Sequence, residues 1–348
     1  MKMRAWAMGW LLLGSSAGMA GAAEWFVATT GNDAAEGTSW ATAKQTIQAG
    51  IDAASSNDVV WVSNGVYATG GGRAVVGTRA NRVSIDRAVT VCSVNGPDET
   101  FIEGAGMRCA YVTNGATLAG FTLTNGTTAV ASELNATNID YDGGGVLCEA
   151  TAIVTNCILT GNWASEEGGG AVGGCLYDCC LNGNSTWNMG GGSAGGIRVR
   201  CVYSENHADM AGGGAEGGTL TGCTLTNNSS AYGGGAVNST MDYCLIQNNT
   251  GGDEGGGILG GALNRCVLEN NLCTGWIGGG GAARGAVLNN CLLDGNRAES
   301  TLGDEPSGGG AKDCTLVNCT VVGNTGFWGG GVRGGTMINC IVYGNTAT

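Results

Sequence analysis

Short apolar runs return at a nearly fixed interval along the chain from residue 141 onward. Each unit opens with a run of glycines, continues through a short apolar stretch to a cysteine, and has an apolar or aromatic residue two positions later. Runs this short, bounded by glycine and asparagine, are typical of β-strands joined by tight turns. A glycine-rich unit of about 22 residues cannot keep a pair of helices, because glycine destabilises a helix interior. We therefore expect a succession of short strands.

Two residue types keep this repeat in register. Cysteines recur 21 to 28 residues apart, at Cys157, Cys179, Cys201, Cys223, Cys244, Cys266, Cys291, Cys319 and Cys340. An asparagine follows five residues after each, at Asn162, Asn184, Asn206, Asn228, Asn249, Asn271, Asn296, Asn324 and Asn345. A unit of this size cannot bury a core alone, so the units are expected to stack, with equivalent residues roughly 4.8 Å apart. The pattern predicts a structural column of cysteines and another of asparagines.

The predicted fold class is all-β: a right-handed parallel β-helix of roughly a dozen coils with a short N-terminal capping helix. Asparagine is expected to make the corners because it tolerates a left-handed φ and bonds its neighbours through the side-chain amide. Glycine suits corners that have no room for a Cβ. The Asn-Gly pairs beginning at Asn64, Asn95, Asn114, Asn125 and Asn182 are interpreted as corners between parallel strands rather than as hairpin turns.

Residues 1–22 are expected to be a signal peptide. Lys2 and Arg4 precede an apolar stretch at 5–13, and Ala20-Gly21-Ala22 fits the cleavage rule for small residues. The stretch is too short to span a bilayer, and no later stretch is long enough. We therefore expect a secreted or cell-surface protein without a transmembrane span in this chain.

Residues 23–56 are expected to form an N-terminal cap. Ala43, Ile47, Ile51 and Ala54 lie on one face of a predicted helix near 41–55, which would cover the open end of the first coil. The β-helix is expected over 57–348, with irregular coils at 57–140 and regular repeats at 141–348. Strands in the irregular part are expected near 59–62, 66–67, 88–92, 110–113 and 120–124. Because the sequence stops in mid-repeat, we expect its C-terminus to be truncated.

Composition narrows the range of partners. The 348 residues include 68 glycines and two prolines, without the every-third-residue glycine of collagen. A net charge of −13 argues against a nucleic-acid partner, because phosphate binding needs a basic face. A single histidine excludes multi-histidine metal sites. We expect a monomer without a cofactor; calcium is the one alternative.

The repeats are similar to those of known secreted proteins. Gly-Gly-Gly-Ala-Val at 168–172 and 233–237, with Leu-Thr-Gly-Asn at 159–162 and Leu-Asp-Gly-Asn at 293–296, resembles the repeats of chlamydial polymorphic outer-membrane proteins. The segments 26–33, 37–40 and 46–48 resemble the start of right-handed β-helix proteins of the pectin-lyase-like superfamily. That superfamily includes lyases, hydrolases, tail spikes and adhesins, so the resemblance implies a fold and leaves the function open.

The nine column cysteines are predicted to be reduced and buried. Equivalent Cβ atoms in adjacent coils point the same way nearly 5 Å apart, whereas a disulfide needs converging Cβ atoms about 3.8 Å apart. One or two disulfides remain open among the other seven, Cys92, Cys109, Cys148, Cys175, Cys180, Cys273 and Cys314. No C-x-x-C motif occurs, and a regular column offers no tetrahedral zinc geometry.

Candidate catalytic groups are sparse, and no catalytic residue is assigned. Asp253, Glu254, Asp304 and Glu305 lie in loops between an asparagine and the next glycine run, and they are interpreted as solvated charges. They are also the groups that would bind calcium or act as acids. His207 follows a column asparagine without a matched nucleophile in the pattern, and it is interpreted as a turn residue.

Two sets of side chains are candidates for ligand binding. Large aromatic residues recur after the asparagine column and are expected along one edge, where they stack on sugar rings, contact a protein or cover glycine backbone: Trp163, Trp187, Tyr232, Trp276, Phe327 and Trp328. Arg284, Lys312 and Arg333 occupy the same position in three successive units. They predict a cationic stripe for a carboxylate or sulfate group, unless neighbouring acids or solvent relieve their repulsion.

The favoured function is that of an exported bacterial adhesin or binding scaffold with a glycan or a surface protein as partner. Shallow features repeated along the stack favour this interpretation. A passenger fragment with a purely structural role is a further hypothesis. The enzymatic alternative is a polysaccharide lyase or glycoside hydrolase, which would gather carboxylates and basic groups at one place.

Overall fold

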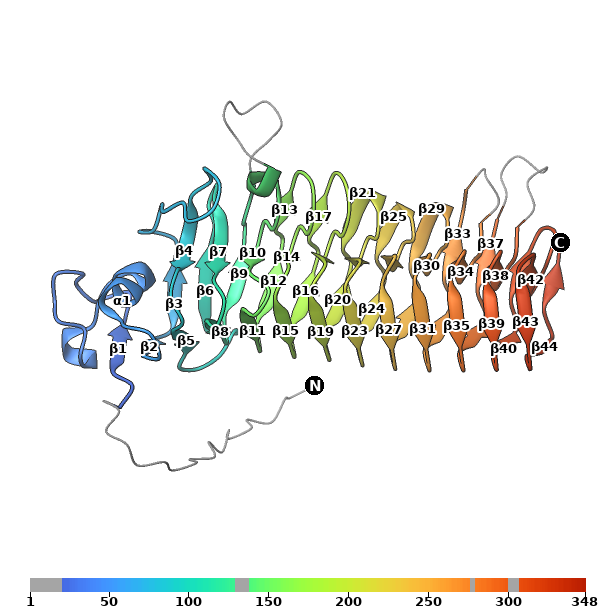
Figure 1. The fold of residues 1–348 in the computed structure, drawn as a ribbon. Helices are drawn as coiled ribbons and strands as arrows, with labels where there is room; N and C mark the ends of the chain where they lie inside the picture. Colours follow the sequence, from blue (N-terminus) through green and yellow to red (C-terminus); the bar gives the residue numbers. More distant parts are fainter. Residues whose placement is uncertain (1–20, 129–137, 276–278, 300–306) are drawn as a thin grey trace.

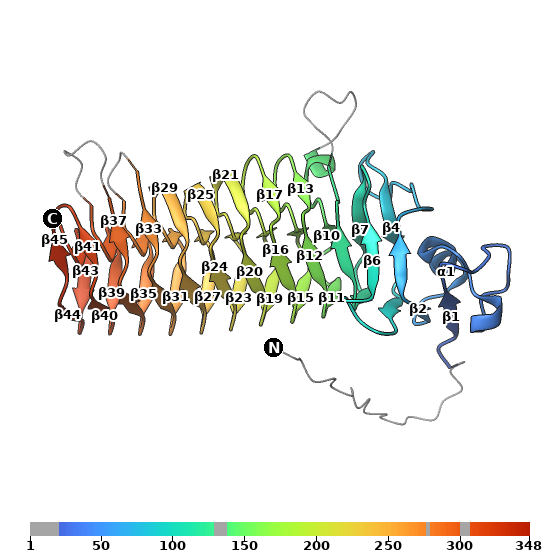
Figure 2. The ribbon, with the colours of Figure 1, turned by 180° about the vertical axis from the view of Figure 1, so that it is seen from behind.

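The chain forms a right-handed parallel β-helix, as predicted (Figure 1). The computed structural model describes residues 21–128, 138–275, 279–299 and 307–348. The predicted signal peptide therefore lies almost wholly outside the described residues. Four parallel sheets, here named A to D, run along the rod, and from Val146 onward each coil contributes one strand to each sheet in the order C, A, B, D. Seen from behind, the same strands follow one another without a break along the rod (Figure 2).

Sheets A and B form two adjoining sides of the rod. The 13 strands of sheet A are β1 Glu24–Val27, β2 Val59–Val62, β5 Thr90–Ser93, β8 Thr117–Ala119, β11 Ile153–Thr155, β15 Cys175–Tyr177, β19 Ile197–Val199, β23 Thr219–Thr221, β27 Thr240–Asp242, β31 Ala262–Asn264, β35 Val287–Asn289, β39 Thr315–Val317 and β43 Thr336–Ile338. The 12 strands of sheet B are β3 Gly65–Tyr67, β6 Thr100–Glu103, β9 Thr122–Thr124, β12 Ile158–Thr160, β16 Cys180–Asn182, β20 Val202–Ser204, β24 Thr224–Thr226, β28 Leu245–Gln247, β32 Val267–Glu269, β36 Leu292–Asp294, β40 Thr320–Val322 and β44 Ile341–Tyr343.

Sheets C and D complete each coil. The 11 strands of sheet C are β4 Asn81–Ile85, β7 Arg108–Val112, β10 Val146–Cys148, β14 Ala171–Val172, β18 Ser193–Ala194, β22 Ala215–Glu216, β26 Ala236–Val237, β30 Ile258–Leu259, β34 Ala283–Arg284, β38 Ala311–Lys312 and β42 Val332–Arg333. The nine strands of sheet D are β13 Trp163–Ala164, β17 Ser185–Thr186, β21 His207–Ala211, β25 Ser229–Tyr232, β29 Thr250–Glu254, β33 Leu272–Cys273, β37 Arg297–Ala298, β41 Thr325–Gly326 and β45 Thr346–Ala347.

The core is a set of parallel columns inside the coils. In most three-residue strands of sheets A and B the middle side chain points inward, because side chains alternate between the two faces of a strand. Leu176 and Leu220 in sheet A, and Leu181 and Leu225 in sheet B, are accordingly buried. The residues on either side point outward and are half-buried or exposed.

The asparagine column is continuous from Asn162 to Asn345. Each side-chain amide donates to the Oδ1 of the next asparagine at 2.9–3.0 Å, and the backbone N–H donates to the same oxygen. The second hydrogen of each amide group is donated to a carbonyl oxygen of the preceding coil, as from Asn228 Nδ2 to Tyr203 O at 3.1 Å. Every buried polar atom of the amide thus has a partner, which holds the corner at a fixed register.

The corner conformation differs from the expectation. None of the nine column asparagines, all of which are described, has a positive φ. The left-handed residue is the one before, as at Asn227 (φ 56°), and likewise before the column cysteines, as at Asp178 (φ 54°). The reason is that the corner turns at one left-handed residue whose side chain faces solvent, while the column residue after it turns its side chain inward.

The helix of the N-terminal cap is shorter than the sequence pattern predicts. The structure has a 3-10 helix, η1 (Trp40–Thr42), then the α-helix α1 (Ile47–Ala53), and a second 3-10 helix, η2 (Asn138–Tyr141), later in the chain. Thr46 is the N-cap of α1, and its hydroxyl accepts a hydrogen bond from Ala49 N–H at 3.2 Å. The Asp33 carboxylate accepts three hydrogen bonds of 2.8–3.0 Å, from Gln45 N–H, Thr46 N–H and the Thr46 hydroxyl, and so holds the start of the helix. Ala43, Ile47, Ile51 and Ala54 are all buried against the first coils, as expected.

Candidate functional site

The three cations do stand in register but do not form an exposed stripe. Arg284 pairs with Lys312, and Lys312 with Arg333, in sheet C. Arg284 makes an ion pair with Glu254, and Lys312 is only 8% exposed. Only Arg333 of the three is exposed. Of the three charges in the predicted stripe, that of Arg284 is compensated by a neighbouring carboxylate and that of Lys312 is withdrawn from solvent by burial.

The predicted aromatic row is broken into separate groups. Trp163 and Trp187 form an edge-to-face pair with ring centroids 5.0 Å apart, and Phe327 and Trp328 form another at 5.9 Å. The sheet D strands before Trp187 and Phe327 are six coils apart, which is roughly 29 Å. Tyr232, at the end of β25, is half-buried between them. Trp276 lies outside the described residues.

His207 is a strand residue with partners, which corrects its interpretation as a turn residue without a nucleophile. It opens β21, its Nδ1 lies 2.9 Å from Ser229 Oγ in the next coil, and its Nε2 lies 2.9 Å from Asp209 Oδ1. The side chains of His207 and Asp209 are 51% and 58% exposed. A hydrolytic triad would also need oxyanion donors near the serine, and the N–H of Ser229 already bonds Asn206 O.

An acidic group lies where sheet D turns into sheet C. Burial first, and then the charge of Glu167, raises the pKa of Asp142 to about 6. The Glu167 N–H donates to Asp142 Oδ1 at 3.2 Å. Burial followed by the charge of Glu167 also raises the pKa of Glu216. The charge of Glu167 thus affects both Asp142 and Glu216.

The loop acids do not form a metal site in the described part of the chain. Glu254 forms an ion pair with Arg284, and Asp253 lies in β29. Asp304 and Glu305 fall outside the described residues. No group of three or more histidine, cysteine, aspartate or glutamate side chains is arranged to hold a metal ion among the residues described. No described helix is long and apolar enough to cross a membrane.

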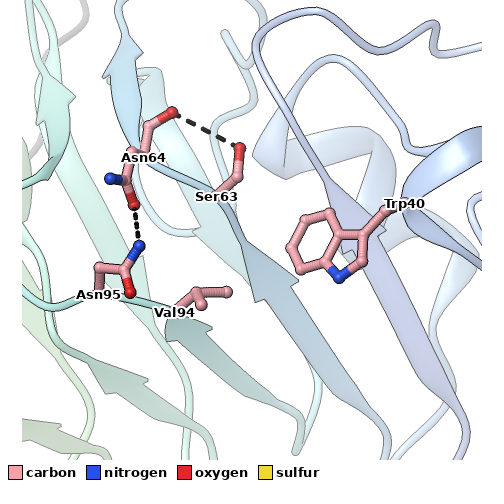
Figure 3. A pocket seen from close by; sticks show the side chains of 5 residues that line it. All are labelled: Trp40, Ser63, Asn64, Val94 and Asn95. Atoms are coloured by element: carbon pink, nitrogen blue, oxygen red, sulfur yellow. Dashed lines mark hydrogen bonds between the residues drawn. The ribbon is translucent and has the colours of Figure 1, made fainter.

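An open depression lies between the cap and the first coils (Figure 3). Its volume is about 350 Å³, and it is lined by Trp40, Ser63, Asn64, Val94 and Asn95. The indole of Trp40 stands on one side, and the two amides stand across from it. All five lining side chains are uncharged, and Trp40 is 47% exposed.

The walls of this depression are held by neighbouring elements. Phe26 of β1 meets Trp40 edge to face, with ring centroids 4.8 Å apart, and this contact orients the indole. Asn64 and Asn95 stand at successive corners after β2 and β5, and the Asn95 amide donates to Asn64 Oδ1 at 2.7 Å. Both asparagines are exposed, and Asn64 Nδ2 also donates to Glu99 Oε2 at 3.4 Å.

Sequence reasoning missed this depression. Asn64 and Asn95 are recognisable as corner residues from their Asn-Gly pairs, but nothing in the repeat places Trp40 beside them. The signal was available only in part: a tryptophan in a predicted cap, next to the first irregular coils.

No protein-family model matches the chain, and no curated protein matches it. Solved structures do. The chain is 11% identical to XylC in complex with xylose (86% of this chain, 75% of that chain, TM-score 0.39). It is 12% identical to a rhamnogalacturonan lyase (85% and 74%, TM-score 0.37). It is 13% identical to the A-module of the mannuronan C-5 epimerase AlgE6 from Azotobacter vinelandii (86% and 95%, TM-score 0.39). The likeness concerns the fold alone.

Proposed function

We propose that this protein is an exported β-helix binding scaffold that recognises a neutral glycan at the Trp40 depression. The observation that supports it most is an exposed indole facing two exposed amides across an open, uncharged hollow. An aromatic ring offers an apolar face to the C–H face of a sugar. Amide side chains both donate and accept, which suits sugar hydroxyls.

The shape of the site favours a chain of sugars over a small molecule. Pockets for small ligands enclose most of the ligand surface, whereas this hollow is open. A polysaccharide lying across it would contact Trp40 with one ring and continue along the rod. The absence of a cation among the lining residues argues against acidic polymers, in line with the net charge of −13.

The export route and the adhesin role belong to the same proposal. A rod with its glycan site near one end is suited to display on or outside a cell, and residues 1–22 have the pattern of a signal peptide. The partner would then be a glycan on another surface or in the surrounding matrix. The resemblance to chlamydial surface-protein repeats supports the same interpretation.

Binding to an array of neutral and anionic glycans tests the proposal. Trp40→Ala should weaken binding to a neutral polysaccharide at least about tenfold, because truncating a central aromatic contact typically costs more than 1.4 kcal/mol. Trp187→Ala removes an equally exposed indole elsewhere and is the matched control, with unchanged binding expected. Equal loss in both variants, or selective binding of sulfated or uronate glycans, would count against the Trp40 site.

Glycoside hydrolysis is a second candidate, favoured by one observation. Asp142, with its pKa raised to about 6, lies beside Glu167, and two neighbouring carboxyl groups, one of them with a raised pKa, are the pairing that such hydrolysis uses. Reducing ends released from a neutral polysaccharide by the purified protein, and lost in both Asp142→Asn and Glu167→Gln, would support it. Release that persists in both variants would remove these residues from consideration.

A further inference from the structure

The column cysteines form a line of buried thiols at the corner between sheets A and B. Eight of the nine are at most 3% exposed, and only Cys340 is half-buried. All are free thiols. Successive positions of the line are in contact: the N–H of Cys201 donates to Cys223 Sγ at 3.4 Å, and the N–H of Cys244 donates to Cys266 Sγ at 3.4 Å. The proposed glycan site makes no use of this line.

The repeat along the line matches a two-coordinate thiolate site. In-register residues on neighbouring parallel strands are separated by roughly 4.8 Å. A metal ion bonded to two thiolates in a straight line needs its sulfurs about 4.6 Å apart, taking about 2.3 Å for one metal–sulfur bond. A small inward turn of each side chain closes that difference. Neither a disulfide nor a tetrahedral site fits the same spacing, because both need converging side chains.

We propose that the cysteine column binds soft monovalent metal ions, Cu(I) or Ag(I), each held between the sulfurs of two successive coils. Thiolate ligands select soft ions such as Cu(I) over harder divalent ions. Where one ion joins two thiols, both protons leave to solvent and the unit carries one negative charge.

A buried cation lies near the centre of the column, on β19. Arg198 points into the coil interior in place of the leucines above and below it, Leu176 and Leu220.

The Arg198 guanidinium is fully buried, and it hydrogen-bonds Ser193 Oγ at 3.3 Å and carbonyl oxygens such as Gly173 O at 3.0 Å. An uncompensated guanidinium in a core is costly, so a negatively charged sulfur–metal unit nearby would reduce that cost.

Titration of the reduced full-length chain with Ag(I), in chloride-free buffer, tests the proposal. We expect up to about four ions per chain, one for each pair of column thiols, to remain bound through gel filtration, with sulfur-to-metal charge-transfer absorption. Changing Cys179, Cys223, Cys266 and Cys319 to alanine leaves no two successive column thiols and should abolish most of this binding. Changing Cys92, Cys148, Cys175 and Cys180 to alanine removes the same number of thiols outside the column and should leave it intact.

Two further measurements decide the outcome even where the column variant does not fold. X-ray absorption on the loaded wild-type protein should show two sulfur neighbours per ion; nitrogen or oxygen neighbours would overturn the proposal. Binding to the native column should raise the melting temperature, because a ligand that binds only the folded state stabilises it. A lowered melting temperature would mean that unfolded thiols capture the ion, and it would also overturn the proposal.

Discussion

A single asparagine of the column carries four hydrogen bonds inside the rod. Asn228 donates from its side chain to Tyr203 O at 3.1 Å and to Asn249 Oδ1 at 3.0 Å. Its own Oδ1 accepts the N–H and the side-chain amide of Asn206 at 3.0 and 2.9 Å. Removing it leaves these buried partners unsatisfied, and each such group costs about 1–3 kcal/mol.

Asn228→Ala should therefore lower the free energy of unfolding by about 2–4 kcal/mol. The denaturant midpoint measured by circular dichroism reports the change. The control is Thr226→Ala on β24 two residues earlier, whose side chain faces outward and should shift stability by less than about 0.5 kcal/mol. Similar effects in the two variants would mean that the column contributes no more than an ordinary surface position.

Asp142 gives the protein a pH dependence of predictable sign. Its pKa is raised to about 6, chiefly by burial and then by Glu167, so the folded state holds this proton more tightly than the unfolded state does. Stability should therefore fall as pH rises from about 4 to about 6 and stay level above that.

Asp142→Asn should remove this dependence. The variant is expected to be more stable than wild type by about 1 kcal/mol at pH 7, a figure reduced for the partial solvent exposure of the group, and equal to it near pH 4. Thermal denaturation at both pH values measures the difference. A variant that is less stable than wild type at pH 7 would show that ionised Asp142 contributes a favourable interaction instead.

At the scale of the elements, glycines serve two different needs. At Gly192, within a glycine triplet, a Cβ would lie 2.5 Å from Gly214 O and 2.7 Å from Tyr203 Cδ1. At Gly183 nothing lies within 4 Å, but φ is +60°. The first glycine is required for packing and the second for backbone conformation.

Gly192→Ala should cost about 3 kcal/mol or more, because the coil has no space into which the methyl group fits. Gly183→Ala should cost only about 1–2 kcal/mol, the penalty for a left-handed alanine. Denaturant midpoints of the two variants give the comparison. A milder effect at Gly192 than at Gly183 would contradict the tight spacing of the glycine triplets.

Periodicity determines which elements could be predicted. Strands of the regular repeats are predictable because every position is repeated in the next coil, and β2 and β3 in the first coil were also expected. β4, β6 and β8 in the irregular coils were missed, since no neighbouring unit repeats their pattern. The repeat predicts that Arg284 and Lys312 lie at equivalent positions of successive coils. It does not predict the ion pair of Arg284 with Glu254 or the burial of Lys312, because both depend on packing between coils.

Across the whole molecule, the repeated columns of buried residues build the core. Binding specificity therefore depends on residues that do not recur from coil to coil. Sheet A extends over 13 strands, so its first and last strands are roughly 58 Å apart. Along this length the paired outward positions differ between coils, as at Cys180, Val202 and Thr224 of sheet B. The Trp40 depression arises where the cap meets the first coils, which is a junction that the repeat itself cannot encode.

Amide hydrogen exchange with and without a neutral polysaccharide tests most directly whether the glycan binds at the Trp40 depression, because it measures protection of backbone amides along the whole chain in one experiment. The Trp40 site predicts slower exchange around residues 38–42, 63–66 and 94–96, with no change at 284 and 311–333 or around 185–188. Protection confined to the segment around Arg284 and Arg333, or to that around Trp187, would place the glycan elsewhere and contradict the account.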